Sequence, residues 1–207
     1  MIRQACHPFC YFCDMKFIFA THNKHKLEEA RAIAGACFNI EGLTELGFHE
    51  DIPETADTLK GNALQKARFV FERFHTDCFA DDTGLEIAAL DGRPGVYSAR
   101  YAGEHCTYED NVCKVLSEME GLTQREACFK TVIALILNGQ EYFFEGRVDG
   151  EIITENKGTS GFGYDPIFRP LSSPLTFAEL SEEEKNAISH RGRAMQKLME
   201  FLKSRCQ

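Results

Sequence analysis

Phe79-Ala80-Asp81-Asp82-Thr83-Gly84-Leu85 joins an apolar run to two adjacent carboxylates and a Thr-Gly pair. Cys78 to Ala80 are typical of the end of a buried strand, and the polar residues that follow predict a turn at this point. Paired carboxylates at a strand end can hold Mg²⁺ through oxygen ligands, or one of them can activate a water molecule. A merely solvated turn is the alternative, so the rest of the chain has to decide between the two.

The overall composition is that of an ordinary globular protein. The chain has 207 residues, of which 43% are hydrophobic and 27% are charged, enough for one sizeable core or two closely joined lobes. Its formal net charge of −9 repels a phosphate backbone, so we expect no nucleic-acid partner. Nine scattered cysteines favour reduced thiols in the cytoplasm, and no apolar run approaches membrane-spanning length, so we expect no membrane partner.

Residues 1–14 differ from the rest of the chain. Cys6, Cys10 and Cys13 have the C-x3-C-x2-C spacing of a radical SAM iron-sulfur site. That chemistry needs a large barrel behind the cluster, whereas this chain restarts at Met15 with a new strand. We therefore expect residues 1–14 to be a disordered N-terminal extension, with Met15 as the natural start and residues 15–207 as a single domain.

A short apolar strand, Lys16 to Ala20, leads directly into a polar segment and a helix. The segment, Thr21-His22-Asn23-Lys24-His25-Lys26, places cap residues and lysines at the helix start. Unpaired N–H groups, the helix dipole and the lysines together suit a phosphate. The segment lacks the glycines of a Walker loop or a dinucleotide fingerprint, and an ordinary helix cap with surface lysines is the alternative.

A second helix is predicted after the acidic loop at residues 48–58, which has Glu54 near its centre. Asp57 or Thr58 can cap this helix, whose apolar stripe includes Leu59, Ala63, Val70 and Phe74. Asn62 and Lys66 stand one turn apart on another face, and this polar face could look into a cleft.

Further elements follow the Asp-Asp pair. We expect a second short strand at residues 85–90, a turn at 91–95, a purely structural helix that begins at Thr107, and strands at 127–137 and 141–148. Asn138-Gly139 between the last two is the strongest short hairpin signal. A glycine-rich loop at 158–166 carries Phe162 and Tyr164, which could stack on a base. The last helical region opens at Ser181, and Gly192 is expected to kink or split it.

The order of these motifs is specific: Thr-x-Asn-x-x-Lys, Asp-Asp-Thr-Gly, Pro-Gly-Val-Tyr-Ser-Ala-Arg, Gly-Phe-Gly-Tyr-Asp-Pro and Ser-His-Arg-Gly. From Met15 to Lys203 the chain resembles the inosine triphosphate pyrophosphatase family, whose members hydrolyse ITP, dITP and XTP to the monophosphate and pyrophosphate. The resemblance implies an α/β fold with an elongated mixed sheet, flanking helices and two lobes around a central cleft. It also implies a homodimer and Mg²⁺ as the cofactor.

The resemblance also assigns roles to individual residues. Glu54 and Asp82 would hold Mg²⁺, with Asp81 in support and Asp82 as the catalytic proton acceptor. Thr83 stands where the family commonly has Ser, which keeps the hydroxyl. The resemblance implies that residues at the start of the first helix bind the triphosphate, and that residues of the glycine-rich loop and the last helices bind the base. The implied substrate-binding residues are Thr21, His22, Asn23, Lys24, His25, Lys26, Lys66, Thr83, Phe162, Gly163, Tyr164, Asp165, Lys185, His190 and Arg191.

Other readings of the same residues are weaker. Asp82-Thr83-Gly84 also matches the aspartic protease signature. This mixed α/β chain has a single copy of it, however, and the charged Asp81 precedes it at a position that is normally apolar. Haloacid-dehalogenase phosphatases need Asp-x-Asp, and Thr83 takes the second position here. A non-catalytic nucleotide sensor would need the phosphate-binding residues but not the carboxylates, so the complete set of acidic residues counts against it. Maf-type pyrophosphatases do similar chemistry, but Ser-His-Arg-Gly favours the inosine triphosphatase assignment.

Overall fold

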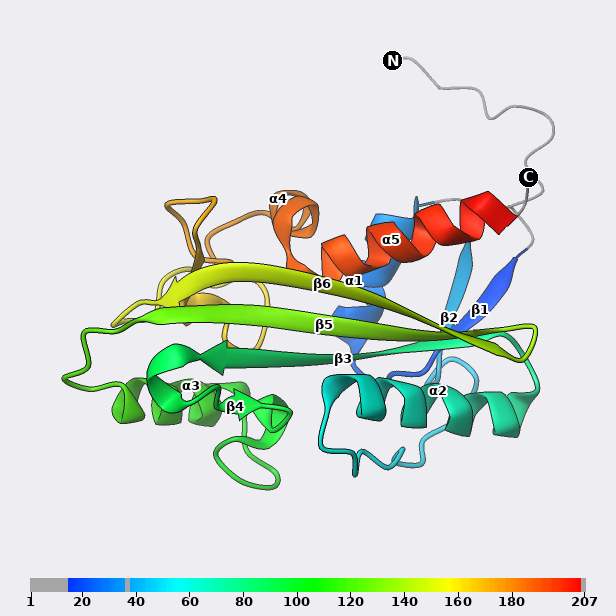
Figure 1. Cartoon of the computed structure of the whole chain (residues 1–207), viewed down its shortest axis with the longest axis horizontal. Coiled ribbons are helices and arrows are strands. Elements are labelled where there is room, and N and C mark those ends of the chain that lie inside the picture. Colours follow the sequence, from blue (N-terminus) through cyan, green and yellow to red (C-terminus); the bar gives the residue numbers. More distant parts are fainter. Residues whose placement is uncertain (1–14, 36–37, 206–207) are drawn as a thin grey trace, which may run out of the picture.

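The computed structural model describes residues 15–35 and 38–205, which form a mixed α/β fold around one seven-stranded sheet (Figure 1). The predicted extension at residues 1–14, with its three cysteines, lies outside the described residues. The strands are β1 (Lys16–Phe19), β2 (Asn39–Gly42), β3 (Cys78–Ile87), β4 (Pro94–Gly95), β5 (Glu126–Leu137), β6 (Gln140–Ile152) and β7 (Phe168–Pro170). The helices are α1 (Lys24–Ala34), α2 (Leu59–Phe74), α3 (Tyr108–Glu118), α4 (Glu182–Ile188) and α5 (His190–Arg205).

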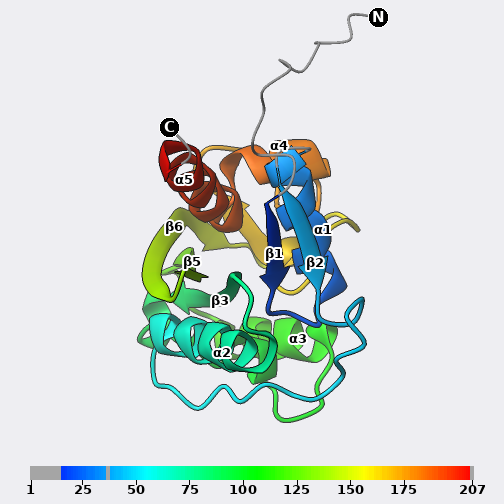
Figure 2. The same cartoon turned by 90° about the vertical axis from the view of Figure 1, so that its right-hand side faces the viewer.

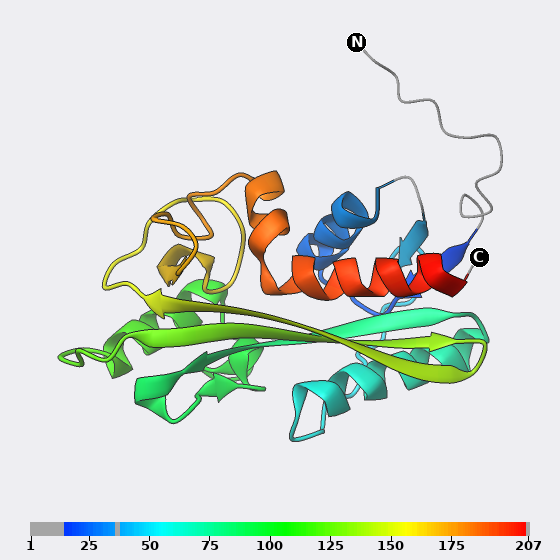
Figure 3. The same ribbon diagram turned by 45° about the horizontal axis from the view of Figure 1, so that its top comes forward.

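The strands are ordered β2-β1-β3-β5-β6-β7, with β4 beside β3. β1 pairs in parallel with β2 and with the start of β3, and all other pairs are antiparallel. β5 and β6 are the longest strands and run most of the length of the molecule (Figure 3). Asn138 and Gly139 connect them with positive φ angles of 51° and 75°, which confirms the predicted hairpin.

β3 differs from the prediction, because the chain does not turn at the paired carboxylates. Asp81 and Asp82 lie in the middle of the strand and pair with Ile133 and Val132 of β5. The separate strand expected at residues 85–90 was also wrong, since β3 continues to Ile87 before a 3₁₀ turn. The continuous partner β5 supplies ladder hydrogen bonds throughout, and this tertiary context outweighs the low strand propensity of Asp and Gly.

The paired carboxylates occupy a special place in the sheet nevertheless. β1 pairs with β3 only through Ile18 and Phe19, opposite Cys78 and Phe79, and the chain then leaves the sheet after Ala20. β3 therefore loses its neighbour on that side just before Asp81. A ligand can approach at this point, which is where open α/β sheets commonly bind ligands.

Helices cover both faces of the sheet, as Figure 2 shows end-on. α1, α4 and α5 lie on one side, while α2 and α3 lie on the other (Figures 1 and 2). One buried cluster, which includes the stacked Phe19 and Phe79, packs beneath α1 and α5, and a second lies under α2. A third, around Phe129, Phe168 and Phe177, fills the opposite end of the sheet. No helix in residues 15–35 and 38–205 is long and apolar enough to span a membrane.

The helix starts agree with the cap residues in the sequence. Thr58 caps α2, and Thr107 and Ser181 form capping boxes at α3 and α4. The last helical region does split, but at Ser189 and not at Gly192. Gly192 lies inside α5, where a Cβ would come within 1.9 Å of the Asn186 carbonyl oxygen. The glycine therefore permits the close packing of α4 on α5, and the extended backbone of Ser189 makes the break.

The strand β2 (Asn39–Gly42) is an element that the sequence patterns did not predict.

A glycine in β6 also fixes the start of α5. A Cβ at Gly146 would lie 1.9 Å from the His190 carbonyl oxygen and 2.7 Å from the Ala194 nitrogen. We expect Gly146→Ala to lower the free energy of unfolding by about 2 kcal/mol or more, because backbone would have to move. For a chain of this size that corresponds to a fall in Tm of about 4 to 8 °C, measurable by calorimetry.

Gly47→Ala is the control for this variant. Gly47 has a φ of 71° and no heavy atom within 4 Å of a built Cβ, so alanine there meets only backbone strain of about 1 kcal/mol. Equal losses of Tm in the two variants would show that the packing of α5 against β6 is not the constraint.

Candidate active site

A cavity of about 350 Å³ opens beside the middle of β3, and it gathers most of the predicted site. Fifteen of the predicted residues line it: Thr21, His22, Asn23, Lys26, Glu54, Lys66, Asp82, Thr83, Phe162, Gly163, Tyr164, Asp165, Lys185, His190 and Arg191. Lys24 and His25 do not. Lys24 points outward and pairs with Glu28, whereas His25 stacks on Phe162 from a smaller neighbouring cavity.

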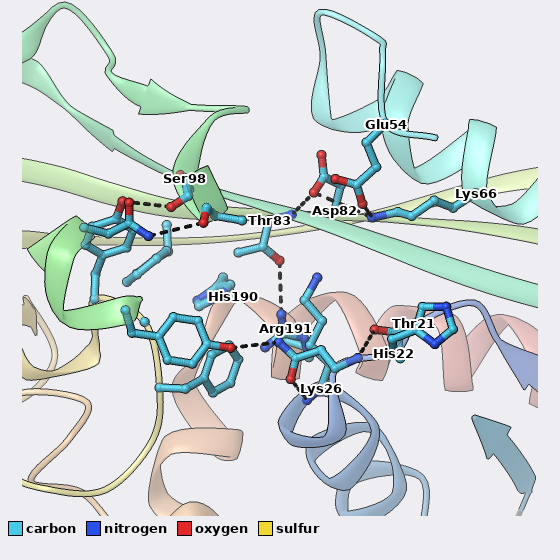
Figure 4. A pocket seen from close by; sticks show the side chains of 18 of the residues that line it. Thr21, His22, Lys26, Glu54, Lys66, Asp82, Thr83, Ser98, His190 and Arg191 are labelled. Carbon is cyan, nitrogen blue, oxygen red and sulfur yellow. Dashed lines mark hydrogen bonds and ion pairs between the residues drawn. The ribbon is translucent and has the colours of Figure 1, made fainter. Parts of the chain in front are cut away.

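Strand alternation sends the two adjacent carboxylates to opposite sides of β3. Successive side chains of a strand point to opposite faces, so Asp82 meets α2 while Asp81 meets α1 and α5. Figure 4 shows this division: Glu54, Lys66 and Asp82 gather on one side of the strand, and Lys26 and Arg191 lie on the other. The Asp-Asp pair therefore organises two separate groups of charges.

Asp82 is held by the polar face of α2. Its Oδ2 accepts a hydrogen bond from Asn62 Nδ2 at 3.1 Å, and its Oδ1 lies 3.8 Å from Lys66 Nζ. Lys66 also pairs directly with Glu54, so one ammonium group bridges two carboxylates. Burial raises the pKa of Asp82 above its ordinary value, against the opposing pull of Lys66. The prediction that Asn62 and Lys66 look into a cleft is confirmed for Lys66, which lines the cavity, whereas Asn62 does not line it and contacts Asp82 instead.

Asp81 is fully engaged on the other side. Its Oδ1 accepts from Lys26 Nζ at 2.9 Å, and its Oδ2 accepts from Arg191 Nε at 3.0 Å. Burial by itself would raise the pKa of Asp81, but Lys26 and Arg191 outweigh it and hold that pKa below its ordinary value. Asp81 is thus an ionised anchor that fixes the positions of two cations.

The start of α1 has the geometry of a phosphate site. Asn23 caps the helix, with its Oδ1 accepting from the backbone N–H groups of His25 and Lys26 at 3.0 and 3.3 Å. Thr21 Oγ1 in turn accepts from the Asn23 backbone N–H at 3.1 Å. His22 contacts the Glu50 carbonyl oxygen through Nε2 at 2.9 Å, which ties this segment to the acidic loop.

Lys185 and Arg191 belong to a buried ion-pair network beside the Phe162 ring. Lys185 Nζ lies 2.7 Å from both Glu29 Oε1 and Asp165 Oδ2, and Arg191 also pairs with Glu29 and donates to Thr83 Oγ1 at 3.2 Å. Both cations lie over the Phe162 ring, at 4.8 and 5.6 Å from its centroid. The network leaves one Lys185 N–H and part of the Arg191 guanidinium available to a ligand.

His190 is a neutral group beside this network. Its ring stacks on Phe129 at 4.5 Å, and burial, together with Arg191 and Lys185, lowers its pKa well below the usual value. Its Nδ1 has no hydrogen-bond partner within residues 15–35 and 38–205. A buried polar atom without a partner is costly, so it marks a position where a ligand or water can bind.

Sequence reasoning missed several residues of this site. Glu29 completes the network of Lys185 and Arg191, and Tyr108, Asn111 and Ser98 line the cavity. α3 was predicted to be purely structural, but its first turn faces the cavity. Glu29 could have been suspected, because it follows Lys26 by three positions and so shares a helix face with it.

Glu54 and Asp82 are the two residues best placed to hold a metal ion. No cluster of three or more Asp, Glu, His or Cys side chains suited to a metal occurs in the part of the chain that the structure describes. Mg²⁺, however, commonly binds through one or two carboxylates together with substrate phosphates and water. Both carboxylates already share the Lys66 ammonium as a counter-cation, so the donor set fits a hard cation that binds with a phosphate substrate.

Comparison with known proteins gives consistent matches. The model of the Ham1 family matches residues 17–201. A dITP/XTP pyrophosphatase from Porphyromonas gingivalis is 55% identical over 188 residues, covering 90% of this chain and 97% of the relative. One from Flavobacterium johnsoniae is 51% identical over 188 residues, covering 91% of this chain and 98% of the relative.

A solved structure extends the match to three dimensions. The Ham1 protein from Coxiella burnetii superposes with a TM-score of 0.83 at 40% identity, covering 92% of this chain and 99% of that one. The elongated mixed sheet with flanking helices is therefore confirmed. The family match spans nearly all of the described residues, and the chain belongs to the Ham1 family.

Proposed function

We propose that this protein hydrolyses the non-standard purine nucleoside triphosphates ITP, dITP and XTP to the monophosphate and pyrophosphate. The observation that supports this proposal is a single cavity lined by three groups of residues. It combines the capped start of α1 with Lys26, the carboxylates Glu54 and Asp82 with Lys66, and the Phe162 ring with Lys185 and Arg191. The relatives named dITP/XTP pyrophosphatases support the same substrate class.

Cleavage between the α and β phosphates requires a positioned water and neutralisation of phosphate charge. In this proposal Glu54 and Asp82 hold Mg²⁺, which would supply that neutralisation at the phosphates. Asp82 accepts the proton of the attacking water, and the raised pKa that burial gives it makes it a stronger base than an exposed aspartate. Asn62 holds the other carboxylate oxygen in place.

The phosphates lie, in this proposal, against the start of α1. Asn23 orders the first turn of the helix, and the backbone N–H groups there and the helix dipole favour negative charge. Lys26 is directed by Asp81, and Lys66 by Glu54 and Asp82, so both ammonium groups are preorganised. Thr21 and Thr83 add hydroxyl groups to the same wall.

The base lies, in this proposal, near Phe162. The free N–H groups of Lys185 and Arg191 can donate to the 6-oxo group of hypoxanthine or xanthine. The 6-amino group of adenine would set donor against donor and leave buried polar groups unpaired. The family resemblance also supports the proposal that the protein is a homodimer, and the scattered cysteines support the proposal that it acts in the cytoplasm. Light scattering of the purified protein tests the first.

The first prediction concerns products and metal. We expect Mg²⁺-dependent release of pyrophosphate from ITP, dITP and XTP, because a grip on the outer phosphates leaves the α–β bond nearest to Asp82. Removal of divalent ions with EDTA should abolish turnover, and added Mg²⁺ should restore it. Separate assays for pyrophosphate and orthophosphate make the measurement, and orthophosphate as the first product would reject the mechanism.

The second prediction concerns the choice of base. We expect kcat/KM for ITP to exceed that for ATP by about 10² to 10⁴, because a buried hydrogen-bonding site rejects a mismatched polar group strongly. GTP shares the 6-oxo group, so it should be rejected less strictly than ATP. A panel of ITP, XTP, GTP and ATP under identical Mg²⁺ gives the ratios. Equal efficiency on ITP and ATP would contradict base selection by these donors.

The third prediction separates the two adjacent carboxylates. Asp82→Asn should lower kcat by about 10² or more, since it removes the proton acceptor and a metal ligand. It should not lower Tm at pH 7, because the pKa of Asp82 is raised in the folded state and its charge therefore opposes folding at that pH.

Asp81→Asn is the matched comparison. The pKa of Asp81 is lowered in the folded state, so its ionised form stabilises the protein at pH 7, and its loss leaves Lys26 and Arg191 without their shared partner. Asp81→Asn should therefore lower Tm clearly. Near wild-type turnover in Asp82→Asn would place the base elsewhere, and equal Tm changes in the two variants would contradict the division of roles.

A further inference from the structure

Tyr108 contacts both the start of α1 and the Phe162 ring. It is the first residue of α3 and lines the cavity wall. Its hydroxyl oxygen accepts a hydrogen bond from Asn23 Nδ2 at 3.2 Å, and its ring lies 5.9 Å from that of Phe162, tilted by 45°. One side chain therefore contacts both the helix start proposed for phosphate and the aromatic ring proposed for the base.

The hydroxyl of Tyr108 keeps its proton free for a ligand. Asn23 Oδ1 is committed to the cap of α1, so Asn23 can offer Tyr108 only its N–H group, and the phenol oxygen must act as the acceptor. None of residues 15–35 and 38–205 accepts the Tyr108 O–H. Tyr108 lines the cavity and is 45% exposed, so this donor is accessible to a ligand, and the bond that the hydroxyl accepts strengthens it as a donor.

The surroundings hold Tyr108 firmly in this position. The capping box of Thr107 and Asp110 fixes the first turn of α3, and Val112 and Val115 anchor the helix in the core. Asn111 accepts from the Ala102 N–H at 2.8 Å, which secures the preceding loop to the same turn. A donor held this way needs little ordering when a ligand binds.

The sugar of a nucleotide joins its base to its phosphates, so it must cross the part of the cavity between Phe162 and Asn23. We propose that Tyr108 is a sugar-binding residue of this site, which donates its O–H to an oxygen of the sugar and covers the sugar with its ring. This inference rests on the proposed function, and it names the residue that recognises the middle of the substrate.

The test removes the hydroxyl and keeps the ring. Tyr108→Phe should raise KM for ITP, and Kd for inosine monophosphate measured by calorimetry, by about 3- to 10-fold, the usual effect of one lost hydrogen bond. kcat should stay within about 2-fold of wild type, because the reacting phosphate is not touched. Kd for pyrophosphate with Mg²⁺ should not change, because pyrophosphate has no sugar.

Tyr97→Phe is the control. Tyr97 is 53% exposed, lies before the same helix and does not line the cavity, so its variant should match wild type for all three ligands. Comparison of ITP with dITP locates the acceptor. A loss confined to ITP indicates the 2′-hydroxyl, an equal loss indicates another sugar oxygen, and both support the proposal.

Two outcomes would overturn the inference while leaving the proposed function intact. Unchanged affinity of Tyr108→Phe for inosine monophosphate would show that the hydroxyl binds no sugar. Parallel losses for inosine monophosphate and pyrophosphate would show that Tyr108 acts through Asn23 on the phosphates. If instead wild type released no pyrophosphate from ITP, the proposed function itself would fail, and the binding measurements would still decide the role of Tyr108.

Discussion

The structure of the site depends on the need to pair buried charges on both faces of one strand. Asp81 and Asp82 lie in the centre of β3, where neither carboxylate is well solvated, and strand geometry forces them apart. Each face must therefore supply its own cations. α1 and α5 supply Lys26 and Arg191 to Asp81, whereas α2 supplies Lys66 and the amide of Asn62 to Asp82. The helices around the cavity are positioned by this requirement as well as by their apolar faces.

The same requirement gives Asp81 and Asp82 different electrostatic properties. Asp81 has strong partners on both oxygens, so it stays ionised and contributes a fixed charge. Asp82 has a neutral amide and a more distant ammonium, so burial dominates and its pKa rises. Two identical side chains that are adjacent in sequence thus acquire opposite pKa shifts from their surroundings, and the proposed roles of Asp81 as an anchor and Asp82 as a base agree with these shifts.

Several helix starts and one hairpin were predictable from local sequence, because short motifs carry their own geometry, whereas the site residues were assigned through the family resemblance. The helix starts at Thr107 and Ser181 and the Asn138-Gly139 hairpin formed as predicted, and Thr58 is the cap of α2 among the two candidates. The prediction failed where distant partners decided the outcome. β5 keeps β3 extended through the Asp-Asp pair, and Glu29 joins Lys185 only because α1 packs beside α4 and α5. Tyr108 reaches Asn23 across 85 positions of sequence, which no local pattern encodes.

The ion pairs also determine the electrostatic character of the cavity before any nucleotide arrives. Four cationic side chains line the cavity together with four carboxylates, Asp51, Glu54, Asp82 and Asp165, while Asp81 and Glu29 lie directly behind. The balance is slightly negative, although the proposed substrate is a polyanion. A bare triphosphate would meet stronger net repulsion here than one that carries a divalent ion, because the ion cancels part of the phosphate charge. The charge balance of the cavity therefore favours metal-loaded over metal-free nucleotides, whatever base they carry.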